Sequence, residues 1–185
     1  KALRALLGEE GEIRYTKAHQ SRVFDDFEIG AITPEAFYAS LQSAATRAIS
    51  EDEIRAAWNA MLLDAPLARF DFVRAIAARY RTFLFSNTNA IHKAAFDQTL
   101  ALALGGEGRF DKLFERAYYS HEFRMRKPHA ATYRALLDEN GLRPERTLMI
   151  DDNLDNIRGA REAGLQVYHL TGELLEAKEL TDLLR

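Results

Sequence analysis

Three clusters of polar residues in this 185-residue sequence combine side chains that could bind a phosphate and a metal ion. The first is Ser-Asn-Thr-Asn at residues 86–89, directly after the apolar run Thr-Phe-Leu-Phe. A hydroxyl group and free backbone N–H groups at the end of a strand can hold a phosphoryl oxygen. Ser/Asn turns are also common without any ligand, so this cluster alone leaves both interpretations open.

The second cluster, Arg-Met-Arg-Lys-Pro at residues 124–128, places a lysine directly before a proline that is expected to open a helix. The ammonium group of Lys127 would then lie near a helix N-terminus, where anions are favoured. A solvated basic loop is the alternative interpretation, and it suits Arg124 and Arg126 better than Lys127.

The third cluster, Asp-Asp-Asn-Leu-Asp-Asn at residues 151–156, begins with two adjacent acids after the apolar run Leu-Met-Ile. Side chains alternate along a strand, so Asp151 and Asp152 can face one site only where the strand turns into a loop. Paired carboxylates repel each other unless a cation lies between them, and oxygen ligands favour a hard ion such as Mg²⁺. Capping of a following helix is the alternative role for these residues.

Four short apolar runs, at residues 82–85, 117–120, 147–150 and 166–170, are expected to form the strands that position these clusters. Helical patterns follow each of them, over residues 90–103, 128–141 and 154–164 and in a last helix after residue 170. Alternating strands and helices predict an α/β fold with a doubly wound, Rossmann-like parallel sheet. Ligands bind such sheets at the carboxyl ends of the strands, which is where the three clusters fall.

The first 80 residues have helical patterns instead. Thr33 before Pro34 is a helix start, and Ser50 with Glu53 is a capping box. A further amphipathic helix is expected over residues 66–80. The predicted organisation is a small helical module, residues 1–63, joined to an α/β core, residues 64–185.

Composition excludes several classes of function. The net charge is −3, so no basic field is available to bind nucleic acid. Cysteine is absent, which excludes disulfides, thiolate zinc sites and cysteine nucleophiles, and fits a reducing cytoplasm. The longest apolar runs are far shorter than the ~20 residues that span a bilayer. Neither nucleic acid nor a membrane is expected as a partner.

Together, the order Phe-Ser-Asn-Thr-Asn, Lys-Pro and Ile-Asp-Asp-Asn-x-x-Asn resembles the second, third and fourth motifs of the haloacid dehalogenase superfamily. Residues 24–37 are similar to the cap of a subgroup that contains sugar-1-phosphate-type phosphatases and the phosphatase domain of soluble epoxide hydrolase. The resemblance covers essentially the whole chain. It implies a Rossmann-like core with a small helical-bundle cap inserted after the first strand.

The resemblance also implies roles for residues that bind the substrate. Ser86 matches the side chain that donates a hydrogen bond to the phosphoryl group, and the Asn87 backbone N–H would assist it. Lys127 matches the lysine that neutralises the nucleophile and the substrate phosphate. His92, in the helix after Ser86, has two interpretations, as a residue that faces the site or as an ordinary surface histidine.

A second set of roles concerns the metal. Asp152 matches the Mg²⁺-binding acid of the fourth motif, and Asp151 would be a second ligand, directly or through water. Asn156, four residues beyond Asp152, matches a position that supports these ligands.

Two features depart from the family pattern. Arg124 stands where the subgroup usually has glycine. The first motif, a nucleophilic Asp after an N-terminal apolar strand, is not found before the cap. That Asp is expected upstream of Lys1, in roughly 15–25 further residues, and the chain as given should be inactive alone. The strands ending at Ser86 and Asp151 should then lie roughly 9–10 Å apart, two strand spacings, with an empty lane between them.

The predicted function is a Mg²⁺-dependent phosphatase that hydrolyses a small phosphorylated metabolite, for instance a sugar phosphate, through an aspartyl-phosphate intermediate. The alternative is a catalytically inactive protein of the same fold that acts as a binding or interaction module. A response-regulator receiver domain also combines an acidic pair, a Ser/Thr and a Lys. Its acids come first along the chain, whereas here they come last.

Overall fold

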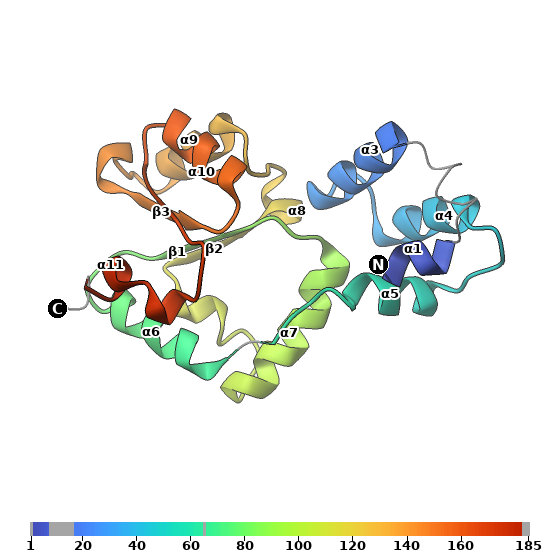
Figure 1. Ribbon diagram of the computed structural model, residues 1–185, viewed down its shortest axis with the longest axis horizontal. Helices are drawn as coiled ribbons and strands as arrows, with labels where there is room; N and C mark the ends of the chain where they lie inside the picture. The colour runs from blue at the N-terminus through green and yellow to red at the C-terminus, as the bar shows by residue number, and fades with distance from the viewer. Residues whose placement is uncertain (1, 8–16, 65, 183–185) are drawn as a thin grey trace. The chain divides into compact units, whose positions relative to one another are not determined.

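The computed structural model describes residues 2–7, 17–64 and 66–182 (Figure 1). The structure is mixed α/β, and its two described strand pairs are both parallel. The chain divides into two compact units, residues 1–67 with 82–124 and residues 68–81 with 125–185. Each unit has its own helices and its own strand pair.

The described part of the first unit begins with helices, as the sequence predicts. Their bounds are α1 (Ala2–Leu7), α3 (Lys17–Glu28), α4 (Pro34–Ala44) and α5 (Glu51–Asn59). Thr33 caps α4, since its Oγ1 accepts a hydrogen bond from the Ala36 N–H over 3.3 Å. The predicted capping box of α5 is confirmed, because Ser50 and Glu53 each accept a bond from the other's backbone N–H.

These helices enclose an apolar core that also reaches α7 (Ala90–Leu104). Amphipathic helices are stable mainly because such a face is buried, and here the buried face draws on helices far apart in the sequence. The buried members of this core are Leu7, Phe27, Phe37, Tyr38, Leu41, Ala44, Ile49, Ile54 and Ile91. Ile91 lies beyond the predicted module boundary at residue 63, which stays a prediction.

The strand pair of the first unit carries the Ser-Asn-Thr-Asn cluster. β1 (Phe83–Ser86) pairs in parallel with β2 (Arg116–Tyr119), with Ser86 opposite Tyr119. The polar cluster leads from β1 into α7, and Gly105 caps the end of α7 with a φ of 73° that suits glycine. The connection to β2 contains the short helix η1 (Asp111–Leu113), and β2 continues into α8 (Ser120–Phe123).

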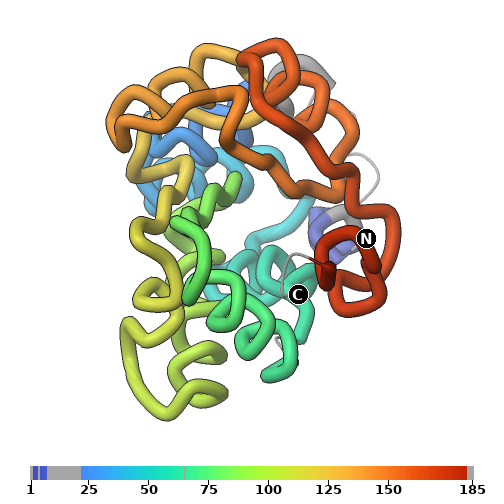
Figure 2. The backbone as a smooth tube through the Cα atoms, turned by 90° about the vertical axis from the view of Figure 1, so that its left-hand side faces the viewer, coloured from blue at the N-terminus to red at the C-terminus, as the bar shows by residue number. Residues whose placement is uncertain are grey.

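The second unit contains the acidic cluster. β3 (Leu148–Asp151) pairs in parallel with β4 (Gln166–His169), with Asp151 opposite His169. α10 (Leu154–Glu162) packs against both strands and against α9 (Ala130–Glu139), and α9 and α10 lie side by side in Figures 1 and 2. The remaining helices of the unit are α6 (Leu67–Ala77), η2 (Pro144–Arg146), η3 (Leu174–Glu176) and α11 (Lys178–Thr181).

One predicted helix start is wrong. Pro128 does not open a helix, since α9 begins at Ala130 with His129 as its N-cap residue. Residues before α9 form a turn because Thr132 Oγ1 donates a hydrogen bond to the Arg126 carbonyl over 2.9 Å. The Pro128 carbonyl also packs against Gly159 of α10, which holds residue 128 in the turn.

Two fold predictions stay predictions. The described strands form two parallel pairs, so a single doubly wound sheet is not established by them. The gap for one further strand, expected between the strands that end at Ser86 and Asp151, concerns two different units and also stays a prediction.

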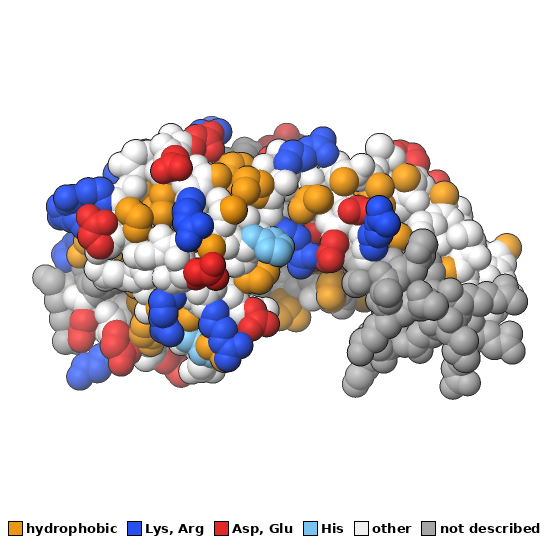
Figure 3. All heavy atoms as spheres, turned by 90° about the horizontal axis from the view of Figure 1, so that it is seen from above, with side chains coloured by type: hydrophobic (Ala, Val, Ile, Leu, Met, Phe, Trp, Pro, Cys, Tyr) orange, Lys and Arg blue, Asp and Glu red, His pale blue; other side chains and the backbone are white. Residues whose placement is uncertain are grey.

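The distribution of charge on the surface agrees with the small net charge of the sequence, −3. Acidic and basic side chains are interspersed on the face shown in Figure 3 and do not separate into fields of one sign. No helix among the described residues is long and apolar enough to cross a membrane.

Candidate active site

The loop after β1 is held at Thr88 by a buried serine. The Thr88 N–H donates a hydrogen bond to Ser120 Oγ over 2.9 Å. That hydroxyl lies 2.8 Å from the Thr88 carbonyl and 2.6 Å from the Glu28 carbonyl, and its single hydrogen can be donated to either. Ser120 is fully buried, so this loop is fixed against both β2 and the end of α3. Ser86 and Asn87, just before Thr88, are partly exposed.

His92 is not a surface histidine. It is 8% exposed, and both of its ring nitrogens are within hydrogen-bond distance of partners, Asn89 and the Trp58 carbonyl. Burial lowers the pKa of His92, while the Trp58 carbonyl opposes this shift. The sequence signal for this arrangement is the spacing of Asn89 and His92, which is that of a helix N-cap and its third residue.

Lys127 and Asp151 form a buried ion pair in the second unit. Lys127 Nζ donates a hydrogen bond to Asp151 Oδ2 over 2.6 Å, and the side chains are 9% and 6% exposed. Asp151 Oδ1 accepts two more bonds, from the Asn153 N–H over 2.8 Å and from Asn156 Nδ2 over 3.0 Å. Three predicted site residues, Lys127, Asp151 and Asn156, are therefore in contact.

The charge of Asp151 is stabilised by these partners. Burial by itself raises the pKa of Asp151. The hydrogen bond and charge of Lys127, together with the bonds from Asn153 and Asn156, outweigh burial and hold the pKa below its usual value. Asp151 is thus a carboxylate in the folded protein, with one of its roughly four acceptor positions left for a further ligand.

Asp152 differs from its neighbour. Its side chain is exposed, and within the described ranges its carboxylate has no hydrogen-bond or ion-pair partner. Its backbone carbonyl accepts a hydrogen bond from His169 Nε2 over 3.0 Å, which ties the loop to the end of β4. The two adjacent acids therefore have different surroundings, one enclosed and one open to solvent.

The donor set fits one mode of Mg²⁺ binding. Among the described residues, no group of three or more His, Cys, Asp or Glu side chains could hold a metal ion. Mg²⁺ commonly binds one or two carboxylates and completes its coordination with waters and phosphate oxygens. Asp152, with the remaining acceptor position of Asp151, offers such a pair.

Three residues that sequence reasoning missed support the Lys127 turn. Thr132 bonds the Arg126 carbonyl, and Tyr133 donates a hydrogen bond from its hydroxyl to the Asn156 carbonyl over 2.7 Å. A Cβ on Gly159 would lie 1.7 Å from the Pro128 carbonyl oxygen, so only glycine permits this close approach. No local sequence pattern marks Gly159, because its contact is with a residue 31 positions away.

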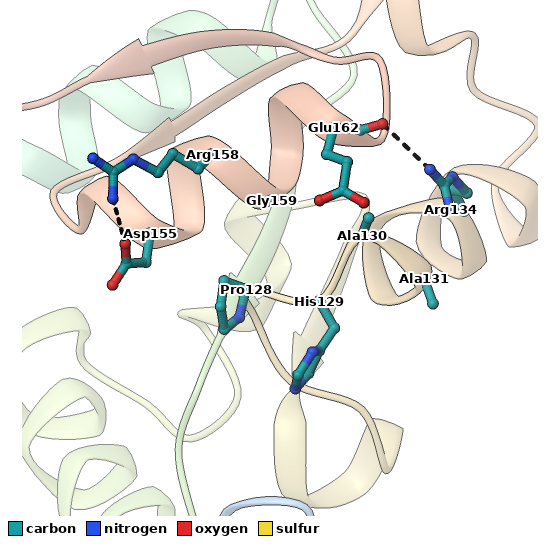
Figure 4. A pocket seen from close by; sticks show the side chains of 9 residues that line it. All are labelled: Pro128, His129, Ala130, Ala131, Arg134, Asp155, Arg158, Gly159 and Glu162. Carbon is teal, nitrogen blue, oxygen red and sulfur yellow. Dashed lines mark hydrogen bonds and ion pairs between the residues drawn. The ribbon is translucent and has the colours of Figure 1, made fainter.

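A groove of about 570 Å³ lies beside this turn, between α9 and α10 (Figure 4). Arg158 pairs with Asp155 over 3.0 Å, and Arg134 donates a hydrogen bond to the Glu162 carbonyl over 3.3 Å. Arg158 is therefore paired with an acid of the groove, and the Lys127–Asp151 pair does not line the groove. The lining residues are Pro128, His129, Ala130, Ala131, Arg134, Asp155, Arg158, Gly159 and Glu162.

Arg124, which replaces the usual glycine, adopts a left-handed backbone with φ of 61°. This conformation explains why glycine suits the position. The Arg124 guanidinium donates a hydrogen bond to the Gly30 carbonyl, so in this chain the position also contacts the turn after α3.

The site residues fall into two groups. Lys127, Asp151, Asp152 and Asn156 belong to the second unit, whereas Ser86 and Asn87 belong to the first. Their convergence on one phosphate site stays a prediction.

Comparisons with known proteins agree with the motifs. A D-ribitol-5-phosphate phosphatase from Bacteroides thetaiotaomicron is 23% identical over 176 residues, covering 95% of this chain and 84% of that protein. A haloacid dehalogenase family enzyme of known structure from the same species is 27% identical with a TM-score of 0.85, covering 97% of this chain and 87% of that one. The wild-type form of that enzyme, solved with magnesium and inorganic phosphate, has a TM-score of 0.77, 27% identity and coverage of 96% and 90%.

The family match itself is extensive. Residues 3–164 match the haloacid dehalogenase-like hydrolases, a span that includes all three polar clusters and most of the helical region. The chain belongs to the haloacid dehalogenase-like hydrolase family.

Proposed function

We propose that this protein is a Mg²⁺-dependent phosphatase of a small phosphorylated metabolite, with sugar phosphates and sugar-alcohol phosphates as the substrate class. The observation that carries the proposal is the buried Lys127–Asp151 pair beside the solvent-facing Asp152. A fixed cation next to free carboxylate oxygens suits a site that must hold a phosphate dianion and a divalent cation together.

Similar proteins support the substrate class. One curated relative is named for its action on D-ribitol 5-phosphate, and a structural neighbour was solved with magnesium and inorganic phosphate. A haloacid dehalogenase-like hydrolase with an acidic pair at the end of β3 suits phosphate chemistry, because oxygen ligands favour a hard cation.

Each predicted site residue has its own part in the proposed reaction. Lys127 would stabilise the equatorial oxygens as negative charge develops, and the Ser86 hydroxyl and Asn87 N–H would donate hydrogen bonds to the same oxygens. Asp152 and Asp151 would hold the cation, and Asn156 would keep Asp151 in place. Bound Mg²⁺ would orient the phosphate and offset charge between it and the carboxylates. The proposal includes an aspartate nucleophile N-terminal to Lys1. Its carboxylate would attack phosphorus and break the phosphorus–oxygen ester bond, so that the substrate alcohol leaves, and water would then hydrolyse the aspartyl-phosphate to release phosphate.

The finer architecture belongs to the same proposal. Residues 1–63 would form a helical cap, and residues 64–185 a Rossmann-like core with one doubly wound sheet completed by a first strand. Leu148 and Ile150 of β3, 39% and 37% exposed, support this, because a further element on that strand would cover them.

A phosphatase screen of the complete gene product tests the function. Phosphate release is measured on sugar phosphates, sugar-alcohol phosphates, nucleotides and a phosphopeptide, with Mg²⁺ and with a chelator. We expect Mg²⁺-dependent hydrolysis of the small sugar-type esters. Preference for the phosphopeptide would contradict the substrate class.

Binding without hydrolysis would favour the inactive alternative. Calorimetry with inorganic phosphate and Mg²⁺ identifies that case, and the coding sequence upstream of Lys1 gives an independent check. An aspartate after an apolar strand there supports the enzyme.

A further inference from the structure

The single tryptophan of the chain is hydrogen-bonded to the loop that carries Ser86 and Asn87. Trp58, in α5, donates a hydrogen bond from its indole Nε1 to Asn89 Oδ1 over 3.3 Å. Asn89 is the last residue of the polar cluster after β1 and the N-cap of α7, and it is 1% exposed. A helix from the predicted cap region is thus joined to the end of the proposed phosphate loop by a partly buried hydrogen bond.

The orientation of the Asn89 amide follows from its partners. Asn89 Oδ1 accepts two hydrogen bonds, from Trp58 Nε1 and from the His92 N–H over 3.0 Å. Both partners are donors only, so the oxygen must face them and Nδ2 must face the His92 ring. Rotating the amide by half a turn would place Nδ2 against two N–H donors.

The protonation state of His92 follows in turn. Asn89 Nδ2 lies 3.2 Å from His92 Nδ1, and because Nδ2 can only donate, Nδ1 must be the acceptor. His92 Nε2 lies 3.1 Å from the Trp58 carbonyl, which can only accept, so Nε2 carries the hydrogen. His92 is therefore neutral, and a second proton on Nδ1 would point directly at the amino group of Asn89.

Stacked aromatic rings hold the same residues together. The Trp58 and His92 rings stack with centroids 5.0 Å apart and planes 15° apart, and Trp58 also stacks on Phe24 of α3 at 5.2 Å. Burial lowers the pKa of His92, and the hydrogen bond to the Trp58 carbonyl opposes this shift. Buried polar networks of this kind fix one arrangement when every member is satisfied.

We propose that Asn89, His92 and Trp58 are positioning residues for the phosphate loop, and that they couple occupancy of Ser86 and Asn87 to helix α5. This inference rests on the proposed function, since it assumes that the loop binds a phosphoryl group. The coupling has a short path: Asn89 follows Thr88, which Ser120 fixes, and only Asn87 separates Thr88 from Ser86. A shift of the loop that carries Thr88 and Asn89 with it would move Asn89 relative to Trp58 or move α5 with it.

The hydrogen bonds of neutral His92 to Asn89 and Trp58 can be tested without any ligand, because the fluorescence of Trp58 reports on the stacked His92 ring. In a pH titration we expect one transition below the ordinary range of histidine, caused by protonation of His92. His92→Gln should abolish it, and Leu102→Ala, at an exposed position of α7, should leave it unchanged. Asn89→Asp preserves the helix cap but gives the His92 Nδ1 an anionic acceptor, so the transition should move to higher pH. A transition that persists in His92→Gln, or that does not move in Asn89→Asp, would overturn the network.

The coupling is tested with inorganic phosphate and Mg²⁺ as the probe, on the complete gene product. Binding of phosphate should change the fluorescence emission of Trp58. The Kd for inorganic phosphate, measured by calorimetry, should be about 5-fold or more higher in His92→Gln than in the wild-type protein, which is a typical effect for coupled sites. Circular dichroism checks that the variants are folded. Ser86→Ala should remove the phosphate response while the pH transition of Trp58 remains.

The two levels of proposal fail in different ways. An unchanged Kd in both His92→Gln and Asn89→Asp would overturn the positioning role alone. If phosphate does not bind the wild-type protein, the proposed function falls, and the coupling falls with it.

Discussion

The Lys127 ammonium and the Asp151 carboxylate are in direct contact at 2.6 Å and are almost entirely removed from solvent. Removing water from two charges is costly, and the pair is retained because each charge compensates the other. Asp152, the next residue, is exposed. The acidic pair therefore divides into a carboxylate that is bound to protein donors and one that remains available to a cation.

Replacement of Lys127 with alanine should affect both stability and rate. It leaves the buried Asp151 carboxylate without its cation, which typically costs about 3–5 kcal/mol in the free energy of unfolding. It also removes a stabiliser of the transition state, a loss of about 10²–10³-fold in rate. Lys127→Arg should rescue poorly, because a planar fork does not replace a compact charge. Denaturant unfolding and phosphate release measure the two effects.

Lys178→Ala is the matched control for Lys127, because Lys178 is exposed. It should change stability by no more than about 0.5 kcal/mol. Wild-type stability and rate in Lys127→Ala would reduce Lys127 to an ordinary loop residue.

The two aspartates should separate in their phenotypes. Asp152→Asn should raise the Mg²⁺ concentration needed for activity and cut turnover by orders of magnitude, with little change in stability, because its carboxylate faces solvent. Asp151→Asn should shift the Mg²⁺ dependence less, but should lower stability because it removes the negative charge beside the buried Lys127 ammonium. Mg²⁺ titrations of activity and unfolding curves distinguish these outcomes. An unchanged Mg²⁺ dependence in both variants would rule out the metal assignment.

Gly159→Ala should destabilise the protein although alanine favours helices. In a helix interior this change usually adds about 0.5–1 kcal/mol of stability. Here the new Cβ would lie 1.7 Å from the Pro128 carbonyl oxygen, so the turn before α9 must move. Figure 4 shows Pro128 and Gly159 in this region. We expect a net loss of about 1–3 kcal/mol and a fall in rate, since Lys127 adjoins Pro128.

Gly172→Ala provides the control for Gly159, because a Cβ at that position would meet no atom within 4 Å. Its unfolding curve should match the wild-type curve. If Gly159→Ala is equally stable, the contact with Pro128 does not constrain the turn.

The stability of the protein should decrease as the pH falls below about 7, partly through His92. Burial lowers the pKa of His92 in the folded state, whereas in the unfolded chain it is about 6.5. Between these two values the unfolded state binds more protons, so the free energy of unfolding increases with pH. His92→Gln should make this dependence shallower without removing it, because burial also lowers the pKa of His121. Unfolding free energies at several pH values give the slopes, and equal slopes in variant and wild type would contradict the prediction.

Several features of the chain were readable from sequence because they depend on residues a few positions apart. The cap at Thr33 and the box at Ser50 and Glu53 each span three residues, and backbone N–H groups at a helix start always need such partners. The three polar clusters are likewise local, and their order along the chain indicated the family that the comparisons show.

Other features depended on the tertiary structure because they depend on burial and on long-range contacts. The sequence alone predicted a helix start at Pro128, and it left His92 with two interpretations, as a residue that faces the site or as a surface histidine. A carbonyl packed against Gly159 keeps Pro128 out of the helix, and burial beside a tryptophan 34 residues away excludes the surface interpretation of His92. The difference in surroundings between Asp151 and Asp152 has the same origin. Two identical side chains acquire different chemistry because one is enclosed with Lys127 and Asn156 while the other meets water, and that enclosure exists only once the chain has folded.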